Sequence, residues 1–349
     1  MQNKITGLVT YSPRQSKTSF LASKDEIKKY GIEFKLMRFS KWRKNTTQAL
    51  YDDIRLVLLL LFRNFDFAIL NSGASLMERP RLLRILIKIL NYRRIPSFLL
   101  WRNAAEKFAK IEAKAGNGKY KQMVKLLSEN QHLQHLTISP QTSQDVTQAL
   151  GLSKAVCIGN CQKMPAEYNI SKLPESPPIV LNVASVMDRK GPDLFIKIAA
   201  AVCQHDKKVK FIWIGGAARP QEIDLIERYG LRERVEFRAF MPSPYDWMVK
   251  SSVFLFPSRA EGFGLAAAEA MACYRTVCCF EGTGAQHAVG DTGVIIPAFD
   301  VEAAAAEIRR LLHMPREKMI NYRARERYDN MFSPAAYAAG LSTVIRASN

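Results

Sequence analysis

Metal-binding and disulfide patterns are missing from this chain of 349 residues. Its five histidines form no motif, and its six cysteines lack the paired spacing that holds zinc. Cys157 and Cys161 have no second Cys-x-x-Cys or histidine cluster beside them, and Cys278 and Cys279 fall inside an apolar strand pattern. We therefore expect buried free thiols in a reducing compartment, with neither a zinc module nor a disulfide framework.

Long apolar runs and a dinucleotide-binding fingerprint are also absent. The longest apolar run, which ends at Phe62, is far shorter than the roughly twenty residues of a membrane-spanning helix. No Gly-x-Gly-x-x-Gly follows the first expected strand, which argues against a Rossmann dehydrogenase. The chain starts directly into a strand pattern without a visible signal peptide, so we expect a cytoplasmic protein.

Negative charge is scarce in the first half of the chain. Residues 1–170 hold 28 basic and 12 acidic residues, a net +16, whereas the remainder has a net charge of only +3. A basic segment of this kind is attracted to anionic partners such as lipid headgroups, nucleic acid or a phosphorylated acceptor. The other explanation is that the basic residues only aid solubility. The sequence has no nucleic-acid-binding motif and no interleaved aromatic residues, so nucleic acid ranks last among these partners.

Both halves alternate apolar runs of strand length with helical stretches. This rhythm predicts an α/β fold of two doubly wound, Rossmann-like domains, each with a parallel sheet of six strands. The strands are expected at residues 5–10, 33–39, 65–70, 96–101, 135–139 and 156–159, and at residues 179–184, 211–215, 235–240, 253–256, 276–280 and 294–296. A polar, proline-rich segment at 169–178 suggests a first domain of residues 1–172 and a second of 173–330. Residues 331–349 have the Ser-Pro start and apolar stripe of a final helix.

The most informative stretch is SRAEGFGLAAAEAMA, from Ser258 to Ala272. The strand before it ends at Pro257, which cannot extend a ladder, so Glu261 falls in a loop. Glu269 stands eight positions later, inside a run of strong helix formers. Between them, two glycines let the backbone approach a ligand, and a helix start offers free N–H groups. This order suits the hydroxyl, phosphate and hydroxyl groups of one elongated ligand, such as a nucleotide-sugar.

The Glu-x7-Glu signature, set in PSRAEGFGLAAAEAMA, resembles that of the retaining GT-B glycosyltransferases of the family-4 type, glycosyltransferase group 1. The resemblance covers residues near 180 to 310 well and the first half only in outline. It implies an acceptor-binding first domain and a donor-binding second domain that face each other across a cleft, with a last helix crossing back to the first domain. The plainer explanation of the motif is an ordinary loop followed by an alanine-rich core helix.

The resemblance implies roles for individual residues. Lys190 matches the lysine that neutralises the donor diphosphate and Glu261 the glutamate on the donor sugar, so both are expected catalytic residues. Glu269 matches the residue that binds the ribose. The other expected donor contacts are Ser185, Arg189, Gly215, Gly216, Gly262, Phe263, Gly264 and Leu265.

The resemblance also implies how transfer proceeds. No protein nucleophile is needed, and stabilisation of the departing diphosphate is the main catalytic contribution. The donor is UDP- or GDP-linked, and no cofactor or metal is expected because the chain lacks the Asp-x-Asp that holds a cation in the other major transferase fold. A glycosidase reading fits less well, because its two carboxylates would flank one bond rather than lie along a ligand.

Several positions depart from the family pattern. Ser185 stands where an arginine is usual, and Arg189 is the candidate to supply the missing charge. The glycine-rich loop after the first strand and the histidine after the fourth are both replaced. Residues that could serve a phosphate-bearing acceptor here are Arg14, Lys17, Arg102 and Asn103.

Two functions therefore remain open. One is a glycosyltransferase that moves a hexose from a nucleotide diphosphate sugar to a cell-surface glycan or its lipid-linked precursor. The other is a catalytically silent GT-B partner subunit that binds glycan or stabilises an active transferase.

Residues 79–94, RPRLLRILIKILNYRR, place arginine and lysine among leucine and isoleucine at helical spacing. One explanation is a crossover helix whose apolar side chains pack against the sheet. The other is a basic amphipathic helix on an anionic membrane, which would make the protein peripheral on the inner face of the cell membrane. Both hold if they concern opposite faces of one helix.

Overall fold

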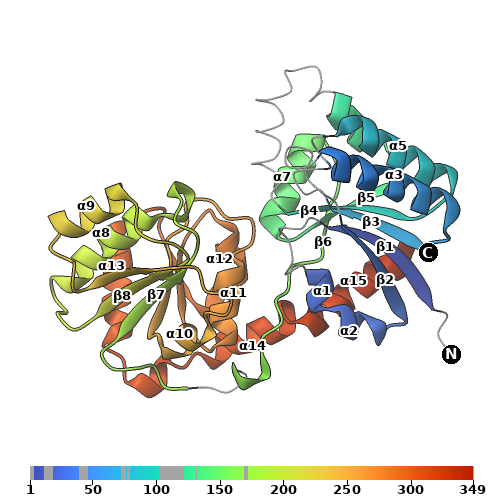
Figure 1. Cartoon of the computed structure of the whole chain (residues 1–349). Coiled ribbons are helices and arrows are strands. Elements are labelled where there is room, and N and C mark those ends of the chain that lie inside the picture. Colours follow the sequence, from blue (N-terminus) through green and yellow to red (C-terminus); the bar gives the residue numbers. More distant parts are fainter. Residues whose placement is uncertain are drawn as a thin grey trace. The chain divides into compact units, whose positions relative to one another are not determined.

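The computed structural model describes residues 4–11, 19–38, 46–71, 76, 79–102, 122–130, 132–168 and 172–348. The chain forms two compact units, one of Met1–Lys163 with Ser333–Asn349 and the other of Met164–Phe332 (Figure 1). Arg14, Lys17 and Asn103, expected on the acceptor side, lie outside the described residues and stay predictions.

The first unit is built around a six-stranded parallel sheet in the order β2-β1-β3-β4-β5-β6. Its strands are β1 (Ile5–Tyr11), β2 (Ile32–Arg38), β3 (Phe67–Asn71), β4 (Ser97–Trp101), β5 (Leu133–Thr137) and β6 (Val156–Cys157). Its helices are α1 (Ser19–Ala22), α2 (Lys24–Lys28), α3 (Thr46–Phe62), α5 (Pro80–Tyr92), α7 (Pro140–Leu150) and α15 (Pro334–Ser348). Every residue of β3 and β4 is buried, as in parallel sheets covered on both faces.

The second unit has a six-stranded parallel sheet in the order β12-β11-β10-β7-β8-β9. Its strands are β7 (Ile179–Val183), β8 (Lys210–Ile214), β9 (Val235–Arg238), β10 (Val253–Phe256), β11 (Val277–Phe280) and β12 (Val294–Ile296). Its α-helices are α8 (Pro192–Cys203), α9 (Pro220–Arg228), α10 (Tyr245–Lys250), α11 (Leu265–Ala272), α12 (Gly284–Val289), α13 (Val301–Leu312) and α14 (Tyr322–Met331). Short 3₁₀ turns are η2 (Ala166–Tyr168), η3 (Asp188–Lys190), η4 (Gly290–Thr292) and η5 (Arg316–Met319).

All twelve strands expected from the sequence are present, and the two doubly wound sheets are confirmed. Their ends shift by one or a few residues, because an apolar run does not mark where ladder hydrogen bonds stop. In the described part of the chain, no helix has the length and apolar content needed to cross a membrane.

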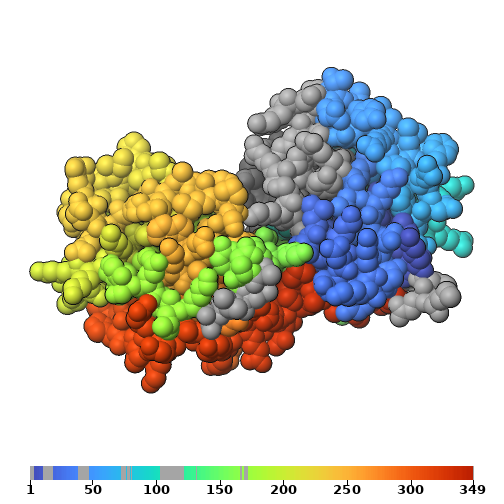
Figure 2. All heavy atoms as spheres, turned by 60° about the horizontal axis from the view of Figure 1, so that its bottom comes forward, coloured from blue at the N-terminus to red at the C-terminus, as the bar shows by residue number. Residues whose placement is uncertain are grey.

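The units divide after residue 163, whereas the sequence suggested a division after residue 172. Residues 172–175 are fastened to the second unit, because Arg275 and Arg316 donate hydrogen bonds to their backbone carbonyls. Figure 2 shows this segment in green against the orange and red parts of that unit. A polar, proline-rich composition therefore did not mark a free linker here.

The last helix, α15, belongs to the first unit, as the resemblance implied. It packs beside α1 and α2. Its Tyr337 is buried, with its ring edge-on to Phe20 at a centroid distance of 5.9 Å. The end of the chain thus completes the core of the first unit.

The expectation of buried thiols holds for four of the six cysteines. Burial raises the pKa of Cys161, Cys273 and Cys279 to about 12, so these thiols stay protonated near neutral pH. The expectation is wrong for Cys157, which is exposed, and Cys203 is only partly buried. Cys157 ends the two-residue strand β6 at the sheet edge, where fewer neighbours cover it.

Candidate active site in the second unit

The strand order of the second sheet reverses beside β7. The chain runs from β7 outward through β8 and β9, and then returns to place β10 on the other side of β7. The loops that leave two such strands diverge and open a crevice at their carboxyl ends, where ligands of α/β proteins bind. Lys190 follows β7 and Glu261 follows β10, so the topology brings both expected catalytic residues to this crevice.

Lys190 and Glu261 form an ion pair between Nζ and Oε2. Their side chains are only 12% and 15% exposed, so water screens the pair weakly. Arg189 Nη1 lies 3.8 Å from the same carboxylate oxygen. Two cationic side chains therefore lie beside one carboxylate. Their net charge of +1 suits an anionic ligand. The sequence identified all three as candidate site residues but did not predict that Lys190 and Glu261 pair with each other.

Gly191 lets the two loops come together. Its φ is +72°, and a Cβ placed there would lie 2.1 Å from the carbonyl oxygen of Pro257. Next to this contact, Arg259 Nη2 bonds Asp193 Oδ2 at 2.7 Å, and Arg259 Nη1 bonds Asp193 Oδ1 at 2.8 Å. Burial opposes ionisation of Asp193, but the Arg259 guanidinium outweighs it and lowers the pKa of that carboxyl. Sequence reasoning missed Arg259, which gave no motif signal although it fixes the positions of both loops.

The segment Gly262–Leu265 contains two glycines and offers backbone groups after Glu261. Gly264, at φ +88°, precedes α11, and no side chain caps the first amides of that helix. The Phe263 ring is buried and lies edge-on to Phe332 at 5.2 Å between centroids. The amides at the start of α11 are therefore the groups that this segment can offer to a phosphate.

Gly284, the first residue of α12, packs closely against the backbone of the loop that contains Glu261. Its N–H donates to the carbonyl of Glu261 at 2.8 Å. A Cβ on Gly284 would lie 2.4 Å from the carbonyl oxygen of Gly262. The backbone around Glu261 is therefore fixed by α12 before any ligand arrives.

Glu269 lies in α11, as its helix-forming neighbours predicted. It is partly buried, and its Oε1 accepts a hydrogen bond of 3.1 Å from the Tyr245 hydroxyl. Tyr245 is only 3% exposed, so its position is fixed by packing. This orienting contact was also missed, because a single tyrosine at the start of the short helix α10 carries no pattern.

Gly215 and Gly216 let the end of β8 approach the loop after β7. A Cβ on Gly215, whose φ is +139°, would lie 2.1 Å from the carbonyl oxygen of Ala184. On Gly216 it would lie 3.2 Å from Val186 Cγ2. Ser185, between these two contacts, is exposed. The glycine pair therefore shapes the loop in which Ser185 replaces the usual arginine.

Arg102, the described acceptor-side residue, follows β4 in the first unit. Its Nε and Nη2 are shielded from solvent and have no hydrogen-bond partner among the described residues. Burial lowers the pKa of its guanidinium, and electrostatic interactions with Tyr337 and Cys161 oppose this shift. A shielded cation without a carboxylate partner is a favourable place for an anionic group of a ligand.

The region that holds these residues is similar to known proteins. Residues 164–327 match the family model of glycosyl transferases group 1. Alpha-D-kanosaminyltransferase of Streptomyces kanamyceticus is 32% identical over 149 residues, which cover 41% of this chain and 39% of that protein. D-inositol 3-phosphate glycosyltransferase of Thermomonospora curvata is 30% identical over 160 residues, which cover 42% and 37%. The chain thus matches about two fifths of the length of these curated relatives.

The fold has solved counterparts. HepE of Anabaena, in complex with UDP and glucose, has a TM-score of 0.73 with this chain at 16% identity, over 98% of this chain and 100% of that one. The paired six-stranded parallel sheets with flanking helices are those of the GT-B fold. The chain has the GT-B fold, and its residues 164–327 match the model of the group 1 glycosyl transferases.

Proposed function

We propose that the protein is a retaining glycosyltransferase that moves a hexose from a UDP- or GDP-linked sugar to an acceptor. The observation that carries this proposal is the convergence of Lys190, Arg189 and Glu261 at the carboxyl ends of β7 and β10, beside the uncapped start of α11. The cations and amides suit a diphosphate, and the carboxylates Glu261 and Glu269 suit sugar and ribose hydroxyls.

In this mechanism the bond between the sugar and the diphosphate breaks while the acceptor oxygen attacks the same face of the sugar. The departing diphosphate takes the acceptor proton. Lys190 stabilises the negative charge that grows on the leaving group, and Glu261 holds the ammonium in place until a donor arrives. Glu269, oriented by Tyr245, holds the ribose.

The acceptor we propose is a cell-surface glycan or its lipid-linked precursor, reached at the cytoplasmic face of the membrane. Arg102 supports an anionic group on that acceptor, because its shielded guanidinium has no carboxylate partner among the described residues. The relative named for D-inositol 3-phosphate is in keeping with a phosphorylated acceptor.

A panel of radiolabelled UDP- and GDP-hexoses tests the function. The purified protein should release the nucleoside diphosphate slowly in water and faster when an extract containing glycan acceptors is added. The anomeric configuration of the product, read by NMR, should equal that of the donor. Donor binding without any turnover would instead indicate the silent partner subunit, and the absence of both would contradict the proposal.

Glu269→Ala should weaken donor binding in a protein that stays folded. The loss of charge-assisted hydrogen bonds to the ribose costs about 1.5–3 kcal/mol, or roughly tenfold to a hundredfold in Kd. Calorimetric titration with UDP and GDP measures this. Glu307→Ala, an exposed-face change on α13, is the matched control. Equal affinity of Glu269→Ala and wild type would remove Glu269 from the ribose site.

Activity should not depend on a divalent metal. Lys190, Arg189 and the α11 amides supply the positive charge that a cation supplies elsewhere. Turnover in EDTA should stay within about twofold of the untreated rate, which is less than the effect of one kcal/mol on the barrier. Complete loss in EDTA with recovery on adding Mn²⁺ would contradict this role for the protein cations.

A further inference from the structure

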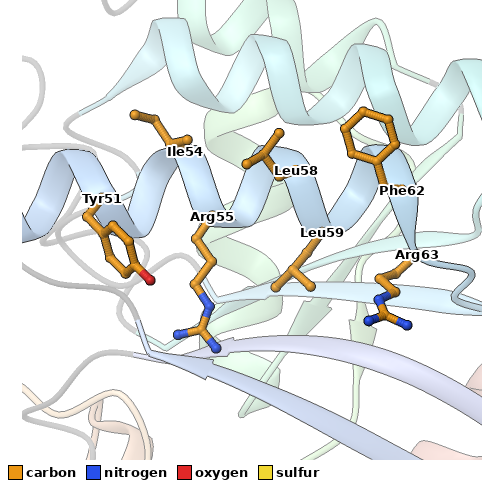
Figure 3. A pocket seen from close by; sticks show the side chains of 7 residues that line it. All are labelled: Tyr51, Ile54, Arg55, Leu58, Leu59, Phe62 and Arg63. Carbon is orange, nitrogen blue, oxygen red and sulfur yellow. The ribbon is translucent and has the colours of Figure 1, made fainter.

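A stripe of exposed apolar side chains runs along α3, in the first unit. These side chains are between 42% and 77% exposed and belong to Leu50, Tyr51, Ile54, Leu58, Leu61 and Phe62. Their spacing of three or four residues places them on one face of the helix. Figure 3 shows Ile54, Leu58 and Phe62 in a row along one side of it. A contiguous apolar face of this size calls for a partner, unlike single apolar residues on a surface.

Cations surround this stripe. Arg55 and Arg63 come from α3 and the turn after it, and α5 packs beside α3 (Figure 1). The helix α5 and the residues after it expose Arg81, Arg84, Lys88 and Arg94, together with Ile85 and Tyr92.

Neither α3 nor α5 exposes a carboxylate on its surface. α5 has no acidic residue, and the two in α3, Asp52 and Asp53, are 5% and 9% exposed. Asp53 pairs with Arg79 and Asp52 accepts from Gln48 at 2.9 Å. The outward face of α3 and α5 therefore combines apolar and cationic groups without an exposed carboxylate.

The structure also separates the roles expected for residues 79–94. Leu83, Leu86, Ile87 and Leu90 are buried in the core, which confirms α5 as a helix packed on the sheet. Arg93 donates to the carbonyls of Leu60 at 2.8 Å and Arg63 at 2.6 Å, so it caps the end of α3 and is not a surface cation. The exposed apolar surface lies chiefly on α3, which the sequence did not single out.

We propose that the outward faces of α3 and α5 form a docking surface for a bilayer that contains anionic lipid. Aromatic and aliphatic side chains of the stripe insert at the level of the headgroups, and the flanking arginines and lysine bind lipid phosphates. This is surface attachment, in keeping with the absence of a membrane-crossing helix among the described residues. It does not depend on the transfer reaction proposed above, because the surface shares no residue with that site.

Charge favours a bilayer over a second copy of the chain. A two-fold contact would set this face against itself and would bring Arg55, Arg63 and Arg84 close to their own counterparts. Like charges facing each other oppose association, whereas an anionic surface neutralises them.

Vesicle flotation tests the proposal with the full chain and two sets of variants. The apolar variant carries Leu58→Ser and Phe62→Ser, and its control carries Phe240→Ser and Met331→Ser, which are 74% and 47% exposed in the second unit. The charge variant carries Arg55→Gln, Arg63→Gln, Arg84→Gln and Lys88→Gln. Its control neutralises four exposed lysines of the second unit, Lys172, Lys207, Lys208 and Lys210. Circular dichroism confirms that each variant is folded.

We expect binding to vesicles of phosphatidylglycerol with phosphatidylcholine, little binding to phosphatidylcholine alone, and release by salt. The charge variant should bind at least about a hundredfold more weakly and the apolar variant about tenfold more weakly. Both controls should bind like wild type.

Other outcomes would overturn the proposal. Equal losses in the variants and their controls would mean that net charge, not this surface, attracts the vesicles. Unchanged binding of the apolar variant would exclude insertion of the stripe. A dimer in light scattering that the apolar variant abolishes would make this face an interface between copies. Because flotation measures no turnover, failure here and failure of the transferase proposal are distinguishable.

Discussion

Lys190→Ala should lower kcat about 10²–10³-fold while donor affinity falls much less. The reason is that charge on the leaving diphosphate grows between the bound donor and the transition state, so the ammonium contributes most when the bond breaks. Rates of nucleoside diphosphate release at saturating donor, together with Kd from calorimetry, separate the two effects.

In Lys190→Ala, Glu261 also loses its ion-pair partner. A control variant must therefore separate this loss from the loss of positive charge beside the diphosphate. Lys190→Arg keeps a positive charge there and should recover part of kcat, although a guanidinium does not fit the same contact. Lys197→Ala removes another lysine from the following helix, one that is 42% exposed and 3.7 Å from Asp193, and should leave kcat unchanged. A kcat near wild type for Lys190→Ala would assign the leaving group to Arg189.

The fold of both units was predictable because parallel strands read as apolar runs. Val253–Phe256 and Ile179–Val183 are such runs, and each is a buried or nearly buried strand. The site was predictable to the extent that its residues follow such strands. Lys190 and Glu261 stand in the loops that follow β7 and β10, and the carboxyl ends of parallel strands meet at one edge of the sheet, whereas their roles came from the family resemblance.

What escaped prediction depends on contacts between residues far apart in the chain. Arg259 binds Asp193 and Tyr245 binds Glu269, pairs that sequence spacing does not relate. The stripe on α3 escaped for another reason. An apolar run predicts burial, and only the packing of the helix shows that Leu58 and Phe62 stay in solvent.

Gly191→Ala should destabilise the second unit and displace the Glu261 loop. Two costs add: the left-handed backbone at φ +72°, and a methyl group placed 2.1 Å from the Pro257 carbonyl oxygen. Because that oxygen belongs to the backbone, the strand end of β10 has to move, and the ion pair between Lys190 and Glu261 depends on that position.

Gly230→Ala isolates the second cost. Gly230 has φ +63° in the same unit, and nothing lies within 4 Å of a Cβ added there. In both variants the left-handed backbone lowers the free energy of unfolding by about 1–2 kcal/mol. Only in Gly191→Ala does the steric clash lower it by about 1–3 kcal/mol more. In thermal unfolding this difference lowers Tm by roughly a further 2–12 °C, and donor affinity should fall in Gly191→Ala alone. Equal Tm values and equal donor affinities in the two variants would show that the loops after β7 and β10 do not depend on their close approach at Gly191.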